Sequence, residues 1–334
     1  MSENGNTRSF RRTAAAVLAA LVLAACHKDE IAVAPFERGE ITTDQISMGP
    51  GPGYAYQVWY SLERHEATAT NHITDWDIAF ESDPEGRGIY LNEARAMYAW
   101  HSPFETLENA ADTAGFGTGK RVEAAARFFE DPAILPPAAG APEVYLLDLG
   151  FSDTGQALGL CWLEVTDRDD TGISFRSRLF GESQISTHRA ERDPARMLVR
   201  FSLRDDRVPE TAPPDGEWDI VFTKYTFSFE DPPLDYLVSG VLLNPAGVRA
   251  AEVSDRNFGD VSAENAEAAG LDRRKDVIGY DWKTFSFDSN RFTVDSDRHF
   301  VVRGIGGLYF KLRFTDFYDD SGASGAPAFE FAVI

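Results

Sequence analysis

One short word occurs twice in this 334-residue chain. It reads Trp-Asp-Ile-x-Phe, first at Trp76–Phe80 and again at Trp218–Phe222. Successive side chains of an extended strand point to opposite faces, so we expect the Trp, Ile and Phe of each copy on one face and the Asp on the other. The alternation therefore predicts a half-buried antiparallel strand in each copy.

The repeat is longer than this word. Residues 56–80 align with residues 196–222, and each segment reads as a strand, a turn-rich loop and a second strand. A further pair, 159–175 and 307–331, shares a Leu, a Thr-Asp, two adjacent Asp and a Gly in the same order. Equivalent segments in the same order predict two tandem antiparallel β modules. We place these modules at residues 54–180 and 195–334, with a polar linker at 181–194.

Alternating patterns continue to the end of the chain, and the helical content should be small. Apolar residues alternate with polar or small ones over Phe310–Phe314 and Phe329–Val333, which is typical of strands with one buried face. The best helix candidates are Lys120–Glu130 and Val261–Ala269, and both are short. The sequence thus predicts an all-β fold.

Residues 1–25 have the pattern of a secretory signal peptide. Three arginines precede an apolar run over residues 13–25, and small residues stand directly before Cys26. The run is too short for a membrane-spanning helix. The small residues and Cys26 resemble a bacterial lipobox, so we expect Cys26 to be the site of lipid attachment. The alternative is an ordinary signal peptide followed by a chance cysteine.

Residues 26–53 are expected to form a lipidated tether. The charged stretch His27–Glu30 resembles the signal by which Bacteroidota send lipoproteins to the outer face of the outer membrane. A generic polar tether is the alternative reading of the same residues. The expected location is the outer membrane, through a lipid anchor, at the cell surface.

Charge and cysteine content exclude some classes of protein. Removing the signal peptide takes away three Arg and one Glu, so the net charge changes from −22 to −24. Such an acidic surface repels nucleic acid, and we expect no nucleic-acid partner. With Cys26 lipidated, Cys161 is the remaining cysteine and no internal disulfide can form. We expect Cys161 to be a small core residue.

The repeated aspartates and the histidines are the first candidate site residues. Asp77 and Asp219 might orient a ligand beside a Trp, but the favoured interpretation is that each accepts backbone N–H groups of the preceding turn. The histidines show no spacing of a closed metal site, so we expect surface or rim positions and no metal site. Beyond His27 in the tether, they are His65, His72, His101, His188 and His299.

Other motifs favour structural roles. Gly115–Arg121 resembles a phosphate loop but lacks its first Gly and its final Ser or Thr, which indicates an ordinary loop. The carboxylate-rich stretches Thr166–Gly172 and Thr315–Gly322 lack the spacing of a calcium loop and predict hairpin turns. Tyr280–Trp282 is aromatic enough to line a pocket, and it also opens a strand.

No catalytic residues are predicted. The sequence has no nucleophile motif, so we expect a protein that is not an enzyme. Catalysis would require carboxylates such as Asp77, Asp219 or Asp319 to gather in one pocket.

The second half of the chain resembles a known family. "IGYDWKTFSFDSNRFTVDSDRHFVVRGIGGLYFKLRFTDFYDDSGASGAPAFEF", residues 278–331, is similar to the C-terminal signature of HmuY-like proteins, the haem-binding lipoproteins of Bacteroidota. The upstream "WDIVFTKYT" and "YLVSGVLLNPAGV" resemble earlier strands of that family, and the first module resembles a diverged copy. The resemblance implies an all-β fold, an outer-membrane lipoprotein, haem as the ligand and a TonB-dependent receptor as the partner.

The sequence departs from the family at the haem ligands. The best-known members hold haem iron with two histidines, one on a hairpin before the Trp-Lys strand and one just after it. From Leu237 to Arg298 this chain has neither His nor Met, so neither ligand position carries over and the cofactor-binding residues are unknown. The alternative function is a non-catalytic interaction or glycan-binding module attached to an outer-membrane complex.

Overall fold

The computed structural model describes residues 39–49, 51–128, 130–136 and 143–334. The predicted signal peptide, Cys26 and the charged stretch after it lie outside these residues. Strands make up 45% and helices 8% of the structure, so the predicted all-β class is confirmed. Within the described residues, no helix is long and apolar enough to cross a bilayer.

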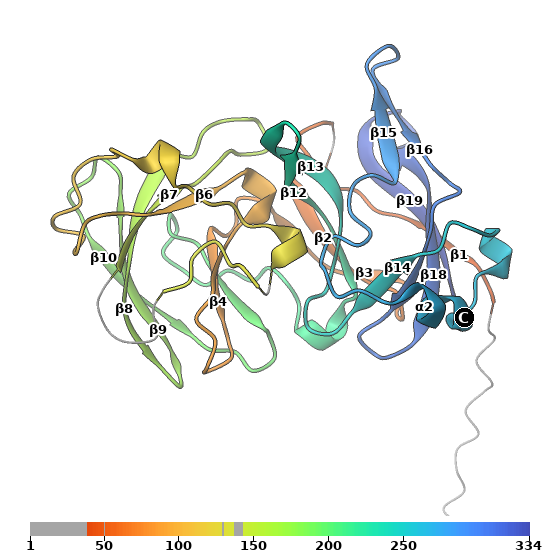
Figure 1. The fold of residues 1–334 in the computed structure, drawn as a ribbon, viewed down its shortest axis with the longest axis horizontal. Helices are drawn as coiled ribbons and strands as arrows, with labels where there is room; N and C mark the ends of the chain where they lie inside the picture. The colour runs from red at the N-terminus through yellow and green to blue at the C-terminus, as the bar shows by residue number, and fades with distance from the viewer. Residues whose placement is uncertain (1–38, 50, 129, 137–142) are drawn as a thin grey trace, which may run out of the picture. The chain divides into compact units, whose positions relative to one another are not determined.

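The first of two β-sandwiches joins a five-stranded sheet to a three-stranded sheet (Figure 1). The five-stranded sheet has the order β10-β9-β8-β7-β6, the smaller sheet has the order β11-β4-β5, and all neighbours are antiparallel. Phe80 of the smaller sheet and Phe175 of the larger one share a single core. The strands are β4 (Ile78–Glu81), β5 (Ile89–Leu91), β6 (Tyr98–His101), β7 (Glu143–Asp148), β8 (Leu160–Asp169), β9 (Gly172–Leu179), β10 (Ser186–Glu191) and β11 (Leu198–Phe201).

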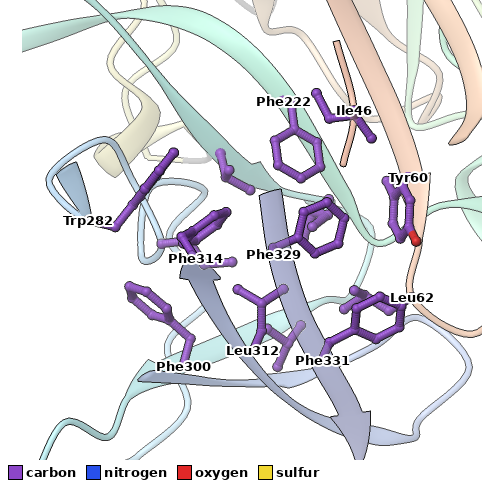
Figure 2. Close-up of a cluster of buried hydrophobic side chains, with 14 of the residues drawn as sticks. Ile46, Tyr60, Leu62, Phe222, Trp282, Phe300, Leu312, Phe314, Phe329 and Phe331 are labelled. Atoms are coloured by element: carbon purple, nitrogen blue, oxygen red, sulfur yellow. The ribbon is translucent and has the colours of Figure 1, made fainter. Parts of the chain in front are cut away.

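The second sandwich joins the sheet β1-β19-β18-β17-β14 to the sheet β13-β12-β2-β3. Figure 2 shows its aromatic core, in which Tyr60 and Phe222 of one sheet pack on Phe329 of the other. The strands are β1 (Thr42–Gln45), β2 (Tyr56–Ser61), β3 (Glu66–His72), β12 (Ile220–Glu230), β13 (Pro233–Leu243), β14 (Arg249–Glu252), β17 (His299–Arg303), β18 (Tyr309–Tyr318) and β19 (Ser324–Val333).

A separate hairpin and a few short helices complete the described chain. The hairpin β15 (Lys283–Ser286) and β16 (Arg291–Val294) stands out from the strands beside it (Figure 1). One predicted helix is confirmed as α2 (Ala263–Ala269), whereas the other is reduced to the single turn η3 (Ala125–Arg127). The remaining turns of 3-10 helix are η1 (Glu93–Arg95), η2 (Phe116–Thr118), η4 (Asp215–Glu217) and η5 (Phe258–Asp260).

The two copies of the sequence repeat exchange strands. In the first copy, β2 pairs with β12 of the second copy, and Tyr60 lies opposite Ile220. In the second copy, β11 pairs with β4 of the first copy, and Phe201 lies opposite Ile78. The two registers are equivalent. The repeat is therefore present, but the tandem arrangement of two self-contained modules is not confirmed.

Two segments expected outside the modules are also strands. Residues 186–191, inside the predicted linker, form β10 and pair with β9 in the first sandwich. Residues 42–45, inside the predicted tether, form β1 and pair with β19 in the second sandwich. Both are edge strands, where one side of the strand supplies all the pairing, so polar sequences such as these are tolerated.

The repeated tryptophans lie on the opposite face from the Ile and Phe of the same word, so the expected shared face is wrong. Ile220 and Phe222 point into the core of the second sandwich, whereas Trp218 packs on the other side of the sheet. There its ring centroid lies 4.6 Å from that of Trp59. The regular strand begins only at Ile220, and the buried Asp219 before it breaks the alternation.

Candidate ligand-binding surface

The repeated aspartates are structural. Oδ2 of Asp219 accepts a hydrogen bond from the Leu62 amide at 2.8 Å, and its Oδ1 accepts one from the Ile305 amide at 2.7 Å. Oδ2 of Asp77 accepts one from the Leu203 amide at 2.6 Å. Both carboxylates are buried. The expected role as an acceptor of backbone N–H groups is confirmed, but the amides of Leu62 and Leu203 belong to the exchanged strand segments rather than to the preceding turn.

An asparagine closes each copy of the motif in the same way. The side chain of Asn92 donates to the carbonyl oxygen of Trp76, and that of Asn244 donates to the carbonyl oxygen of Trp218, each at 2.8 Å. Both asparagines are buried. Since the aspartate oxygens and the tryptophan carbonyl oxygens of both words bond to other parts of the chain, we interpret the words as pieces of the fold. The Nε1 of Trp218 is buried and has no hydrogen-bond partner among the described residues.

The two carboxylate-rich stretches are hairpin turns, as predicted. In the β8–β9 turn, Oδ1 of Asp169 accepts from the Thr171 and Gly172 amides at 2.8 and 2.9 Å. In the β18–β19 turn, Oδ1 of Asp319 accepts from the Ser321 and Ala323 amides, both at 2.9 Å. Asp77, Asp219 and Asp319 therefore each accept hydrogen bonds from backbone amides of the chain itself.

The histidines are scattered, and two of them are buried. His188 bonds Ser177 and Asp206 inside the first sandwich, and His299 lies against Phe258 in the second. The expectation of surface or rim positions is wrong for these two. The other three contact nearby polar groups: His65 with Thr42, His72 with Thr74 and Asp153, and His101 with Glu143. Among the described residues, no cluster of three or more His, Cys, Asp or Glu side chains has the arrangement of a metal site.

Two further candidates have ordinary structural roles. The loop Gly115–Arg121 contains η2 and packs its glycines on the indole of Trp100. A Cβ at Gly115 would lie 3.1 Å from that ring, and φ is +97° there, so glycine is required. Cys161 is buried in the first core, where burial raises the pKa of its thiol to about 12. It is a core residue, as expected.

Exposed aromatic and aliphatic side chains gather on two hairpins of the second sandwich. The inner part of the β12–β13 hairpin is buried, but its outer part is exposed. The tip of the β15–β16 hairpin is also exposed, and Phe287 there shows 90% of its surface to solvent. We call the combined surface the twin-hairpin surface. It consists of the exposed Phe229, Leu234, Tyr236 and Phe287 and the half-buried Phe227, Tyr280, Phe285 and Phe292.

The rings of this surface form two groups. In the first, the Tyr280 ring centroid lies 5.0 Å from that of Phe227 and 6.3 Å from that of Phe229. In the second, the Phe285 ring lies 5.2 Å from that of Phe287 and 5.0 Å from that of Phe292. All four contacts are edge-to-face, so each covers one face of one ring, and the free ring surface is that of the exposed Phe229 and Phe287.

A buried lysine connects the two groups. Nζ of Lys283 donates to the carbonyl oxygens of Ser239 at 2.5 Å and Tyr280 at 3.3 Å. It also lies 5.6 Å from the ring centroid of Phe292 and 4.3 Å from that of Trp282. Burial lowers the pKa of this amine to about 7. Lys283 thus ties the start of β15 to β13 and holds the two aromatic groups on neighbouring elements.

Tyr280 and Trp282 differ in burial. Tyr280 is part of the twin-hairpin surface, but Trp282 is fully buried and stacks on Phe314 with ring centroids 4.0 Å apart (Figure 2). The exposed rings of Phe229 and Phe287 are not among the residues predicted from the sequence. Their signal is the pair of aromatic residues spaced by two, Phe227 with Phe229 and Phe285 with Phe287, each running into a polar turn.

The residues at the hairpins do not fit the two-histidine attachment that the resemblance implies. From Ile220 to Arg298 the chain contains no His, Met or Cys. The oxygen donors near the rings include tyrosine hydroxyls and the carboxylates of Asp235 and Asp281. Burial raises the pKa of Tyr225, with Asp276 adding to the effect, and burial also raises that of Tyr280, with Asp281 adding to it.

The chain matches one family model and is similar to several solved structures. The family model described as HmuY protein matches residues 53–331. Similar solved structures include apo PinO of Porphyromonas gingivitis (12% identity, 89% of this chain and 98% of that chain, TM-score 0.26) and an HmuY-like heme-binding protein of Bacteroides vulgatus (11%, 89% and 95%, 0.23). The apo HmuY analog of Tannerella forsythia is a third (11%, 89% and 98%, 0.25).

No curated protein sequence matches the chain. The match to the family model spans both sandwiches and assigns the chain. The family is one of binding proteins rather than enzymes. The chain belongs to the HmuY family.

Proposed function

We propose that this protein binds haem or a close relative of haem on the twin-hairpin surface. The observation that carries the proposal is the exposed aromatic surface in a chain of the HmuY family. A tetrapyrrole is a large, flat and mostly apolar ring, and exposed aromatic side chains whose faces are free match it in shape and polarity. The surrounding sheets hold both hairpins at their bases.

A Soret titration tests this proposal. Haem is added to a soluble chain of residues 27–334, which lacks the expected signal peptide and Cys26, and the Soret band is followed to saturation. A shifted and saturable band supports haem binding. If the spectrum remained that of free haem throughout the titration, the proposal would be wrong.

We further propose that the protein is lipidated at Cys26 and works at the cell surface beside a TonB-dependent receptor. The support is the lipobox-like end of the signal peptide and the family assignment. Growth with labelled palmitate should mark the wild-type chain and leave the Cys26→Ser variant unlabelled. Protease treatment of intact cells should digest the wild-type protein if it faces outward.

A second candidate function is a non-catalytic interaction or glycan-binding module. Leu234, Tyr236 and Phe287 favour it, because exposed side chains at hairpin tips also suit a partner protein or the flat face of a sugar. Purification with an outer-membrane complex, with no Soret absorbance at any stage, would support this candidate over haem binding.

A further inference from the structure

The twin-hairpin surface has few side chains that could bind the iron of haem. No His, Met or Cys occurs from Ile220 to Arg298, the stretch that supplies every residue of this surface. His299 follows directly, but its ring is buried in the second sandwich against Phe258, 5.4 Å between centroids. The side chains that most often bind haem iron in proteins are thus missing here.

The remaining donors are poorly suited to take their place. Tyrosine binds ferric iron as the phenolate, and the hydroxyls of Tyr225 and Tyr280 sit in surroundings that raise their pKa and disfavour a negative charge. The third tyrosine, Tyr236, is exposed, and its hydroxyl is the phenol that the Tyr236→Phe variant tests. The amine of Lys283 is buried and donates to two carbonyl oxygens. Moving it to an iron atom would leave both oxygens without this donor.

The surface does offer ring faces. Phe229 and Tyr236 on one hairpin and Phe287 on the other are 37%, 57% and 90% exposed. Nucleic-acid bases stack on exposed aromatic side chains in the same manner, and such stacking tolerates different bases because every base has a π face. A porphyrin has the same kind of face whether or not a metal occupies its centre.

Resting on the proposed function, we infer that the twin-hairpin surface holds the tetrapyrrole by its ring faces, without an axial bond from the protein to iron. The ligand class is therefore porphyrins in general, metal-free as well as iron-containing. An axial bond is the interaction that would discriminate haem from the empty ring, and the surface lacks it. The two ligands should bind with affinities within about threefold of each other.

The experiment compares two ligands on one protein. The soluble chain of residues 27–334 is titrated with ferric haem and with metal-free protoporphyrin IX, and binding is followed by quenching of tryptophan fluorescence and by the Soret band. Similar dissociation constants are expected. The ferric complex should lack the visible bands of a low-spin, two-ligand iron, a readout that does not depend on affinity.

Variants at the hairpin tips identify the surface. Phe229→Ser and Phe287→Ser should each weaken both ligands by about tenfold, and by the same factor for the two ligands. Phe151→Ser is the matched control, because Phe151 is 46% exposed and belongs to neither hairpin. It should leave both affinities unchanged.

Donor variants test for a hidden axial bond. Tyr236→Phe and Tyr280→Phe remove a hydroxyl but keep the ring, so both ligands should bind as before. If either variant lost haem but kept protoporphyrin IX, the missing oxygen would be an iron ligand and the inference would be overturned. Circular dichroism establishes that each variant is folded before it is titrated.

The outcomes separate the two proposals. Binding of haem without binding of protoporphyrin IX would leave the proposed function intact and overturn this inference. Binding of neither ligand would overturn both. Binding of both ligands, with the hairpin variants weakened in parallel, is the result expected from ring stacking.

Discussion

Substituting asparagine for each repeated aspartate tests how the two copies of the motif are held. The copies share their backbone contacts, but the second acceptor oxygen has different partners. In Asp219 both oxygens accept backbone amides, from Leu62 and Ile305. In Asp77 one oxygen accepts the Leu203 amide, and the other binds Nη2 of Arg95 at 2.6 Å.

Asp219→Asn should have the smaller effect. The amide oxygen of asparagine can still accept one backbone N–H, but its NH₂ group cannot accept the other. Losing one hydrogen bond to a charged group, and leaving its buried donor unsatisfied, costs about 1.5–3 kcal/mol. Burial raises the pKa of Asp219, because the charged carboxylate loses hydration in the folded chain. Neutral asparagine does not have this desolvation cost, which offsets part of the loss.

Asp77→Asn should cost more, about 3–5 kcal/mol, because it leaves a buried charge without its partner. The Arg95 side chain is 0% exposed. Its Nε and Nη1 have no hydrogen-bond partner in the described part of the chain, so Nη2 carries its main polar contact. Replacing the carboxylate therefore leaves the guanidinium facing an NH₂ group.

Urea unfolding, followed by tryptophan fluorescence and far-UV circular dichroism, measures both costs from the shift in midpoint at an unchanged slope. The double variant Asp77→Asn with Arg95→Met removes the stranded charge and should recover stability relative to Asp77→Asn alone. The reasoning is refuted if Asp219→Asn costs as much as Asp77→Asn, or if the double variant is no more stable than Asp77→Asn.

Three further predictions concern other buried or exposed groups. Trp218→Ala should destabilise the chain by about 3–5 kcal/mol, seen in urea unfolding, because it removes a large buried ring; a folded variant that lost a ligand instead would contradict this. Glu123 is buried, and its pKa is raised to about 8, mainly by burial and secondly by Glu93. Its contribution to the stability of the fold is therefore complete below about pH 4.5 and is lost as pH rises through 8. Glu123→Gln should therefore gain stability relative to wild type as pH rises from 5 to 8, up to about 1.4 kcal/mol per unit, and a flat difference would exclude this titration. Phe287→Ser should change the unfolding free energy by less than about 0.5 kcal/mol, because the ring is exposed, and a larger loss would mean that the hairpin tip supports the fold.

Much of the local structure could be read from the chain. The spacing of apolar residues predicted β12, β18 and β19, because alternation along a strand depends only on neighbouring residues and on one buried face. The Asp-rich stretches predicted the β8–β9 and β18–β19 turns, because an aspartate bonds backbone amides two to four residues away.

The candidate surface was harder to foresee. The sequence predicts Tyr280 as a pocket residue, but it gives no such prediction for Phe229 and Phe287. Their exposure depends on how far each hairpin extends beyond the sheet that supports its base, and this follows from strand pairing rather than from local pattern. The lack of His and Met in this region was visible in the sequence and carries the inference about ring stacking.

The sequence by itself determined the all-β class, the internal repeat and the family, because these depend on local periodicity and on the order of motifs. Only the tertiary structure decided that β2 pairs with β12 and β11 with β4. Both copies of the repeat offer the same register and the same capping aspartate, so either pairing satisfies the local pattern. The choice between a tandem and an exchanged arrangement is made by long-range packing of the two cores, and the repeated word marks the place where the exchange occurs.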